Sequence, residues 1–183
     1  GRVTDVYSEL AAKAAADVQQ IAYAMSKTAS IASSAGMEFE TTSAFLTQMI
    51  ETTQEAPENI GTAMKTIIAR FTELKENVAG TADSEFDDLD YNKVDTALKS
   101  VGISLKDAAG QFRNLDDVFL ELSEKWNTLD RNSQRYIATI AAGSRQQSRF
   151  IAMMQDYSRT QELVTAANNA AGSAQEQYGK TLD

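Results

Sequence analysis

Apolar residues recur at intervals of three and four along most of this 183-residue chain, which is the spacing of one face of an α-helix. The first run extends from Val3 to Ala32 and predicts one long amphipathic helix that ends at Gly36. Residues 40–42 open a second helix, and Pro57 opens a third, because its fixed φ suits the first helical position. We therefore interpret residues 1–80 as an N-terminal helical half made of three helices.

The helical spacing stops at AGTADSEFDDLD, residues 79–90, where small residues are followed by five acids. We interpret residues 81–92 as an acidic linker loop. Asp83, Glu85 and Asp87 share the spacing of the first ligands of an EF-hand. However, Asp88 replaces the glycine that this loop needs and no glutamate stands at its twelfth position, so we expect a solvated loop and not a calcium site.

Residues 93–183 form a C-terminal helical half in which the pattern changes once. Val101, Ile103 and Leu105 stand two positions apart, and a turn with Gly110 follows. This change from a helical to a two-residue period predicts a short β-hairpin at residues 102–114, with Gly102 and Gly110 as its structural turn residues. The expected fold is mainly α, a bundle of about six or seven helices with one short two-stranded hairpin.

The last two expected helices follow this hairpin and a fifth helix. Asp130 or Asn132 is placed to cap the first of them, and Gly143 separates it from a last long helix that runs through Val164.

Charge is distributed unevenly along the chain. The net charge of −9 and a pI near 4.6 argue against nucleic acid as the main partner. The segment 131–160 nevertheless contains a single acid, Asp156, and five arginines. Four of these arginines form a candidate interaction patch: Arg131, Arg135, Arg145 and Arg149. Three alternatives remain open for these arginines: they pair within the fold, they pair between copies or partners, or they bind nucleic acid, which is disfavoured because serines, glutamines and methionines surround them instead of stacking aromatic residues.

The composition also excludes several kinds of catalytic and metal-binding site. The chain has no cysteine, which excludes thiolate nucleophiles and cysteine-ligated metals, and no histidine, which removes the commonest general base and the commonest metal ligand. It contains no phosphate-binding glycine motif, and it contains no apolar run long enough to span a membrane. We therefore expect no enzyme, no cofactor, no metal and no membrane-spanning segment here. Both ends lack evident start or stop signals, so we expect an excerpt from a longer polypeptide.

Three stretches, taken in order, resemble the core of tail tape-measure proteins of long-tailed bacteriophages and prophages. They are AFLTQMIETTQEAPENIGTAMKTIIARF, ALKSVGISLKDAAGQFRNLDDVFLELSEKW and IAAGSRQQSRFIAMMQ. The second contains a unit of the form G-I-x-apolar-x-D-x-x-G-x-F-R, which begins at Gly102 and ends at Arg113, and the third contains A-G-x-R-Q. The resemblance covers residues 35–157, about two thirds of the chain.

The resemblance implies a structural and assembly module and no catalytic residue. Such a protein helps to set tail length, templates tail-tube assembly and leaves the tube ahead of DNA. The implied partners are the tail-tube protein, tail assembly chaperones, distal-tail proteins and further copies of the chain. The implied location is the virion tail, after synthesis in the host cytoplasm. The alternative that the residues leave open is a helical secreted or membrane-acting effector or toxin fragment.

Overall fold

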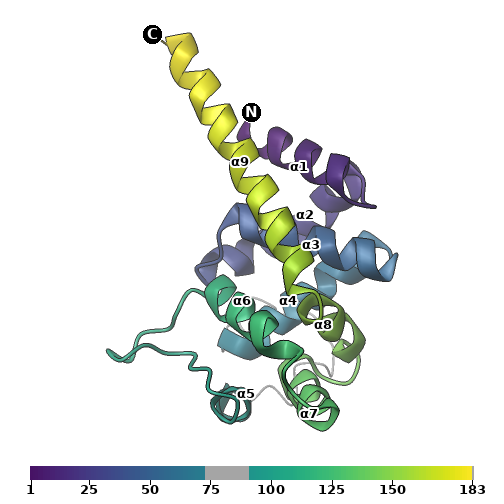
Figure 1. Ribbon diagram of the computed structural model, residues 1–183, viewed down its shortest axis with the longest axis vertical. Helices are drawn as coiled ribbons and strands as arrows, with labels where there is room; N and C mark the ends of the chain where they lie inside the picture. Colours follow the sequence, from purple (N-terminus) through teal and green to yellow (C-terminus); the bar gives the residue numbers. More distant parts are fainter. Residues whose placement is uncertain (73–90, 183) are drawn as a thin grey trace.

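The computed structural model describes residues 1–72 and 91–182. For residues 91, 92 and 173–182 it describes the backbone only. These residues form nine α-helices and no β-strand (Figure 1). The helices are α1 (Arg2–Lys13), α2 (Val18–Ser34), α3 (Phe39–Thr53), α4 (Pro57–Thr72), α5 (Tyr91–Lys99), α6 (Leu115–Trp126), α7 (Arg131–Ala142), α8 (Gln147–Met154) and α9 (Tyr157–Leu182).

The single long helix expected between Val3 and Ala32 is wrong, because the chain breaks between α1 and α2. Ala14 has an extended backbone, with φ −133° and ψ 161°. Asp17 then caps α2 through a reciprocal pair of hydrogen bonds with Gln20: Gln20 N donates to Asp17 Oδ1 at 2.8 Å, and Asp17 N donates to Gln20 Oε1 at 2.9 Å. This capping box starts a new helix although the apolar spacing continues through the break.

The last expected helix is also divided. Residues 144–164 contain the end of a turn, α8 and the start of α9. Arg159 N donates to Asp156 Oδ1 at 3.1 Å, which satisfies a free amide in the first turn of α9. These two divisions raise the number of helices in the described part of the chain from the expected six or seven to nine.

The predicted two-stranded hairpin at residues 102–114 is reduced to one isolated antiparallel bridge between Lys106 and Phe112. Arg113 N donates to Leu105 O at 2.9 Å, and Asp107 N donates to Gln111 O at 2.8 Å. Two isolated strands are only marginally stable, and this segment has no third strand among the described residues beside it. The alternating residues are held by helices instead, because the side chains of Ile103 and Leu105 are buried in the core.

Helix α3 lies at the centre of the molecule. All of its residues from 40 to 50 are buried, and it contacts α1, α2, α4, α8 and α9. Five buried aromatic side chains connect α3, α4, α6 and α8 in a chain of ring contacts, with centroids 5.0–6.2 Å apart: Phe45, Phe119, Phe71, Phe150 and Trp126. Helices from both predicted halves therefore share one hydrophobic core.

The molecule has two distinct ends (Figure 1). Helix α9 packs on α1 and α3 and then continues beyond the other helices at one end, while α5 and α7 lie at the opposite end. The segment between α5 and α6 projects to one side. The predicted acidic linker, residues 81–92, and the EF-hand-like spacing within it lie outside the described residues, apart from residues 91 and 92, which begin α5.

Candidate interaction surface

Helix α7 presents a basic and aromatic outer face. Asp130 caps this helix by accepting a hydrogen bond from Ser133 N at 2.7 Å, and this backbone hydrogen bond lowers the pKa of Asp130. Arg131 and Arg135 lie one turn apart and are exposed, and neither forms an ion pair with another described residue. Tyr136 has 54% of its side chain exposed, the largest value for a bulky apolar residue in the described chain.

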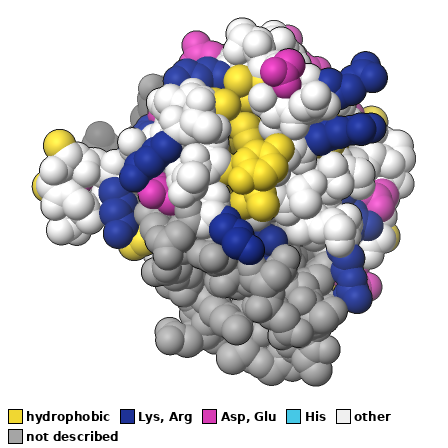
Figure 2. All heavy atoms as spheres, turned by 90° about the horizontal axis from the view of Figure 1, so that it is seen from below, with side chains coloured by type: hydrophobic (Ala, Val, Ile, Leu, Met, Phe, Trp, Pro, Cys, Tyr) yellow, Lys and Arg dark blue, Asp and Glu magenta, His cyan; other side chains and the backbone are white. Residues whose placement is uncertain are grey.

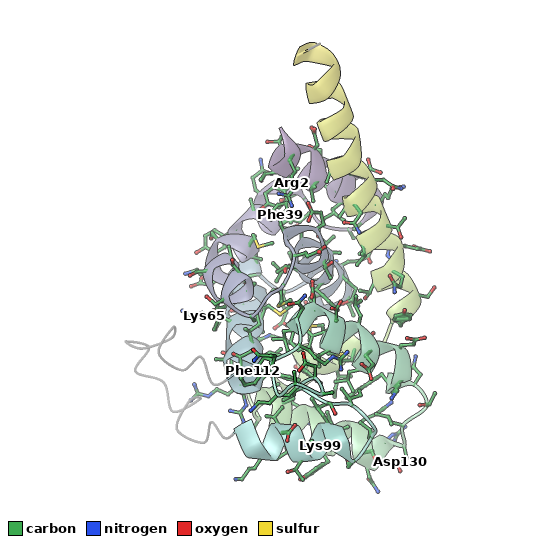
Figure 3. The ribbon with its side chains drawn as sticks, turned by 90° about the vertical axis from the view of Figure 1, so that its left-hand side faces the viewer. Arg2, Phe39, Lys65, Lys99, Phe112 and Asp130 are labelled. Carbon is green, nitrogen blue, oxygen red and sulfur yellow. The ribbon has the colours of Figure 1, made fainter. Side chains whose placement is uncertain are left out.

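This face belongs to the end of the molecule that α5 and α7 form. Figure 3 shows Asp130, the cap of α7, and Lys99 of α5 together at this end, far from Arg2 and Phe39. Figure 2 views the same end and shows apolar side chains gathered in a stripe with Lys and Arg on both sides. The end thus combines an apolar centre with a positive border, in a protein whose net charge is −9.

The four predicted patch arginines do not all lie on this face. Arg145 is exposed in the turn between α7 and α8. Arg149 on α8 points to the end of α3, where its Nε and Nη2 donate to Glu55 Oε2 and Oε1 at 2.9 and 2.7 Å. Its Nη1 also donates to Gln146 Oε1 at 2.6 Å. Arg149 is therefore engaged within the fold, and the patch on α7 consists of Arg131 and Arg135.

The pair of Arg149 and Glu55 forms one arginine clamp, and Arg159 forms a second clamp nearby. Arg159 on α9 forms two hydrogen bonds with Glu51 of α3, which lies four residues before Glu55 in the sequence. Its Nη2 also donates to the carbonyl oxygen of Lys13. The hydrogen bond from Arg159 lowers the pKa of Glu51, and the hydrogen bond from Arg149 likewise lowers the pKa of Glu55. These clamps join residues 108 and 94 positions apart in the sequence, with Glu51 in the last turn of α3 and Glu55 just after the end of this helix.

Helix α6 presents an acidic outer face that the analysis of the sequence did not single out. Asp117, Glu121 and Glu124 recur at intervals of four and three, which places them on one side of the helix. Glu121 is neutralised by Arg113, with Nη2 to Oε2 at 2.7 Å, and by Lys125 at 3.8 Å. Asp117 and Glu124 are exposed and form no ion pair with the rest of the described chain.

Asp116 has a different role from its neighbours on α6. Its side chain is buried, and Glu38 N donates to its Oδ2 at 2.9 Å, which ties the start of α6 to the start of α3. Burial raises the pKa of Asp116, and the backbone hydrogen bond opposes this effect. The residue therefore positions a helix and is not part of the acidic face.

The two predicted turn glycines both have left-handed φ values, +83° at Gly102 and +80° at Gly110. Both lie in the segment between α5 and α6, which also carries Lys106 and Phe112, whose ammonium and ring lie 4.9 Å apart. Next to this segment, a cleft of about 290 Å³ is lined by Ser34, Ala35, Gly36, Thr72, Phe112, Arg113 and Asn114. Arg113 is the one charged side chain that the described residues contribute to this lining.

The described residues also bear on metal binding and on membrane crossing. Within residues 1–72 and 91–182, Asp and Glu side chains nowhere gather in a group of three or more that could hold a metal ion. None of the helices in this part of the chain has both the length and the apolar character needed to cross a bilayer.

No solved structure is significantly similar to the chain. A family model described as phage-related minor tail protein matches residues 1–143, which include α1 to α7 and the acidic and basic faces. Because this match extends over well more than half of the 183 residues, the chain belongs to the family of phage-related minor tail proteins, and its role is that of a structural component of a phage tail.

Proposed function

We propose that this chain is a structural and assembly module of a tail tape-measure protein. In this role it helps to set the length of the tail, templates assembly of the tail tube and leaves the tube ahead of DNA. The tail-tube protein, tail assembly chaperones and distal-tail proteins are its partners, and it is made in the host cytoplasm before it enters the virion. The family match favours this function over the effector or toxin fragment that the residues alone left open.

One observation carries the proposal. The three stretches that resemble tape-measure proteins occupy residues 44–71, 97–126 and 140–155, which are far apart in the sequence. The first provides Phe45 and Phe71, the second provides Phe119 and Trp126, and the third provides Phe150. These are the five rings of the aromatic chain in the core. The resemblance thus extends over one packed unit, as expected for a structural module.

Assembly in the presence of tail-tube protein tests the proposal. We expect the 183-residue chain to bind purified tail-tube protein of the same phage and to accelerate its polymerisation, as followed by light scattering and electron microscopy. Phe119→Ala is the matched variant for the packed unit, because Phe119 contacts both Phe45 and Phe71. Tube assembly that is unaffected by the chain, together with no binding in co-sedimentation, would refute this function.

Tail length provides a second readout in the intact phage. If the polypeptide acts as a ruler, an in-frame helical insertion outside residues 1–183 should lengthen the tail by up to about 1.5 Å per added residue. Insertions of two different lengths allow the increase in tail length per added residue to be measured as a slope. A tail of unchanged length in phages that still assemble would contradict the length-setting role.

We also propose that the segment has no catalytic activity of its own. This proposal rests on the absence of cysteine and histidine from all 183 residues and on the lack of a phosphate-binding motif. Release of soluble fragments from peptidoglycan by the purified chain, above the level of a heat-denatured sample, would show that the proposal is wrong.

A further inference from the structure

The outer face of α7 has the composition of a protein-binding surface. Arg131 and Arg135 are exposed and have no ion-pair partner in the described chain, and Tyr136 follows directly. Arginine and tyrosine are enriched among the residues that dominate binding energy at protein interfaces. Tyr136 is 54% exposed, although burial of its ring on contact would be favourable. Arg131 and Arg135, four positions apart, lie on one side of the helix, and Tyr136 lies about 100° further round the helix from Arg135, so it borders the arginine side and does not share it.

The outer face of α6 has the complementary composition. Asp117 and Glu124 are exposed without ion-pair partners in the described chain, and they stand seven positions apart on the same side. Leu120, which lies between them in the sequence, is only partly buried. Glu121 also lies between them but is already paired with Arg113 and Lys125. The face therefore offers two free carboxylates and the edge of an apolar side chain.

We propose that the α7 face of one copy binds the α6 face of a second copy. Seven residues of helix separate Asp117 from Glu124 by about 10.5 Å, and four residues separate Arg131 from Arg135 by about 6 Å. The length of the two arginine side chains is enough to bridge this difference. In this contact each arginine meets one free carboxylate.

The net charge of the chain explains why the contact uses these two faces. Copies that each carry a charge of −9 repel one another, so most mutual orientations are unfavourable. The α7 face is a place where a carboxylate of a second copy meets unpaired positive charge. Two different surfaces meet in this contact, one at the end of the molecule and one on α6, so repetition adds further copies unless the rotation between them closes a ring (Figure 1).

Charge exchange between the two faces provides the test. Sedimentation velocity of the 183-residue chain should show reversible association at concentrations up to about 1 mM, weaker in 500 mM than in 50 mM salt because screening shortens the reach of exposed charges. Arg131→Glu with Arg135→Glu should weaken association by about tenfold or more, and Asp117→Arg with Glu124→Arg should do the same. A mixture of the two double variants should associate again, because the acidic α7 face of the first now meets the basic α6 face of the second.

A matched control separates this contact from a general effect of charge. Lys27 is exposed on α2, and Lys27→Glu changes the net charge as much as Arg135→Glu does. We expect Lys27→Glu to leave association unchanged and Arg135→Glu alone to weaken it. Circular dichroism melting of every variant reports whether the fold is retained.

Three outcomes would overturn the inference: a monomer at every concentration, association that neither reversal weakens, or double variants that fail to associate when mixed. The inference goes beyond the proposed function, because a chain that stays monomeric but still binds tail-tube protein would refute the contact alone. If the α7 variants lose affinity for tail-tube protein instead, the face has a different occupant and the proposal is wrong.

Discussion

Arg159 on α9 holds Glu51 on α3 through two hydrogen bonds, Nε to Oε2 at 3.0 Å and Nη2 to Oε1 at 2.8 Å. The same Nη2 donates to the carbonyl oxygen of Lys13 at 2.6 Å, so one guanidinium joins the ends of three helices. Both paired side chains are about three quarters buried. This geometry is more than a surface ion pair, because the planar fork of arginine makes both hydrogen bonds at once.

Arg159→Gln should therefore lower the free energy of unfolding by about 1–2 kcal/mol, since it leaves the Glu51 carboxylate without its cation. Urea denaturation measures the change. Glu162→Gln is the control: Glu162 also binds Arg159, at 2.8 Å, but lies three positions away on the same helix and is 64% exposed. We expect this variant to change stability by less than about 0.5 kcal/mol. Equal losses in the two variants would contradict the special role of Glu51.

The two clamps also predict how stability depends on pH. The folded pKa of Glu51 and that of Glu55 are lowered from their ordinary value of 4.5, by Arg159 and Arg149 respectively. Each pair therefore stabilises the fold fully above about pH 4.5, and this contribution is lost as the pH falls through the folded pKa. Burial raises the pKa of Asp116, so its contribution has the opposite sign and becomes more favourable on protonation.

We expect the melting temperature to fall between about pH 5 and pH 3, and we expect Glu51→Gln with Glu55→Gln to make this fall shallower. Thermal melts of the wild-type chain and the double variant across this range measure the difference. A double variant with an unchanged slope would mean that other carboxylates govern the acid transition.

Local signals in the sequence predicted much of the helical content. Pro57 begins α4 and Asp130 caps α7, as expected, because these residues act on the backbone beside them. The break before α2 was missed although Asp17 and Gln20 form a capping box, since the apolar spacing continued across it. Alternation at Ile103 and Leu105 indicated strands, but burial against helices and not strand pairing accounts for it.

The ion pairs of the surface arginines could not be predicted from the sequence, for a different reason. The sequence showed an excess of arginine in residues 131–160, but it could not show which arginines pair across the fold. Arg149 finds Glu55 across 94 positions of sequence, whereas Arg131 remains without an ion pair in the described chain. Such pairings depend on how helices pack, which periodicity along one helix does not encode. The resemblance of three ordered stretches, in contrast, was sufficient to predict a phage tail protein.

Two helical glycines should respond in opposite ways to alanine. A Cβ added at Gly61 of α4 would lie 2.9 Å from the carbonyl oxygen of Ala24 and 2.8 Å from Lys27 Cβ, both on α2. A Cβ added at Gly172 of α9 would meet nothing within 4 Å. We expect Gly61→Ala to destabilise by about 1–3 kcal/mol and Gly172→Ala to stabilise by up to about 1 kcal/mol, the helix propensity gain alone. Stabilisation by Gly61→Ala in denaturant unfolding would show that α2 and α4 separate easily.

Substitution by valine should change stability in opposite directions at two buried threonines. Thr160 Oγ1 on α9 is buried and has no hydrogen-bond partner among the described residues, whereas Thr28 Oγ1 on α2 donates to the carbonyl oxygen of Ala24 at 2.9 Å. Both residues are fully buried, and valine nearly matches threonine in shape. Thr160→Val should raise stability by about 1 kcal/mol, because it removes an unsatisfied hydroxyl, and Thr28→Val should lower it by a similar amount. Thermal melts distinguish them, since 1 kcal/mol corresponds to a shift of about 2–4 °C for a chain of this size. Shifts of the same sign would contradict the difference in hydrogen bonding.

Substitutions of the turn glycines separate the effect of backbone conformation on stability from the effect of side-chain packing. Gly110 has φ +80°, and a Cβ placed there would meet no heavy atom within 4 Å, so any penalty for alanine arises from the backbone alone. We expect Gly110→Ala to destabilise by about 1 kcal/mol and Gly110→Asn to destabilise by less, because asparagine tolerates left-handed φ better than alanine does. Gly102, at φ +83°, should behave similarly, since its added Cβ would lie 3.4 Å from the flexible end of Lys125. Chemical denaturation of these variants measures the order. Equal effects of alanine and asparagine at Gly110, or no effect of either, would mean that the turn relaxes to a negative φ and does not hold the segment between α5 and α6 in place.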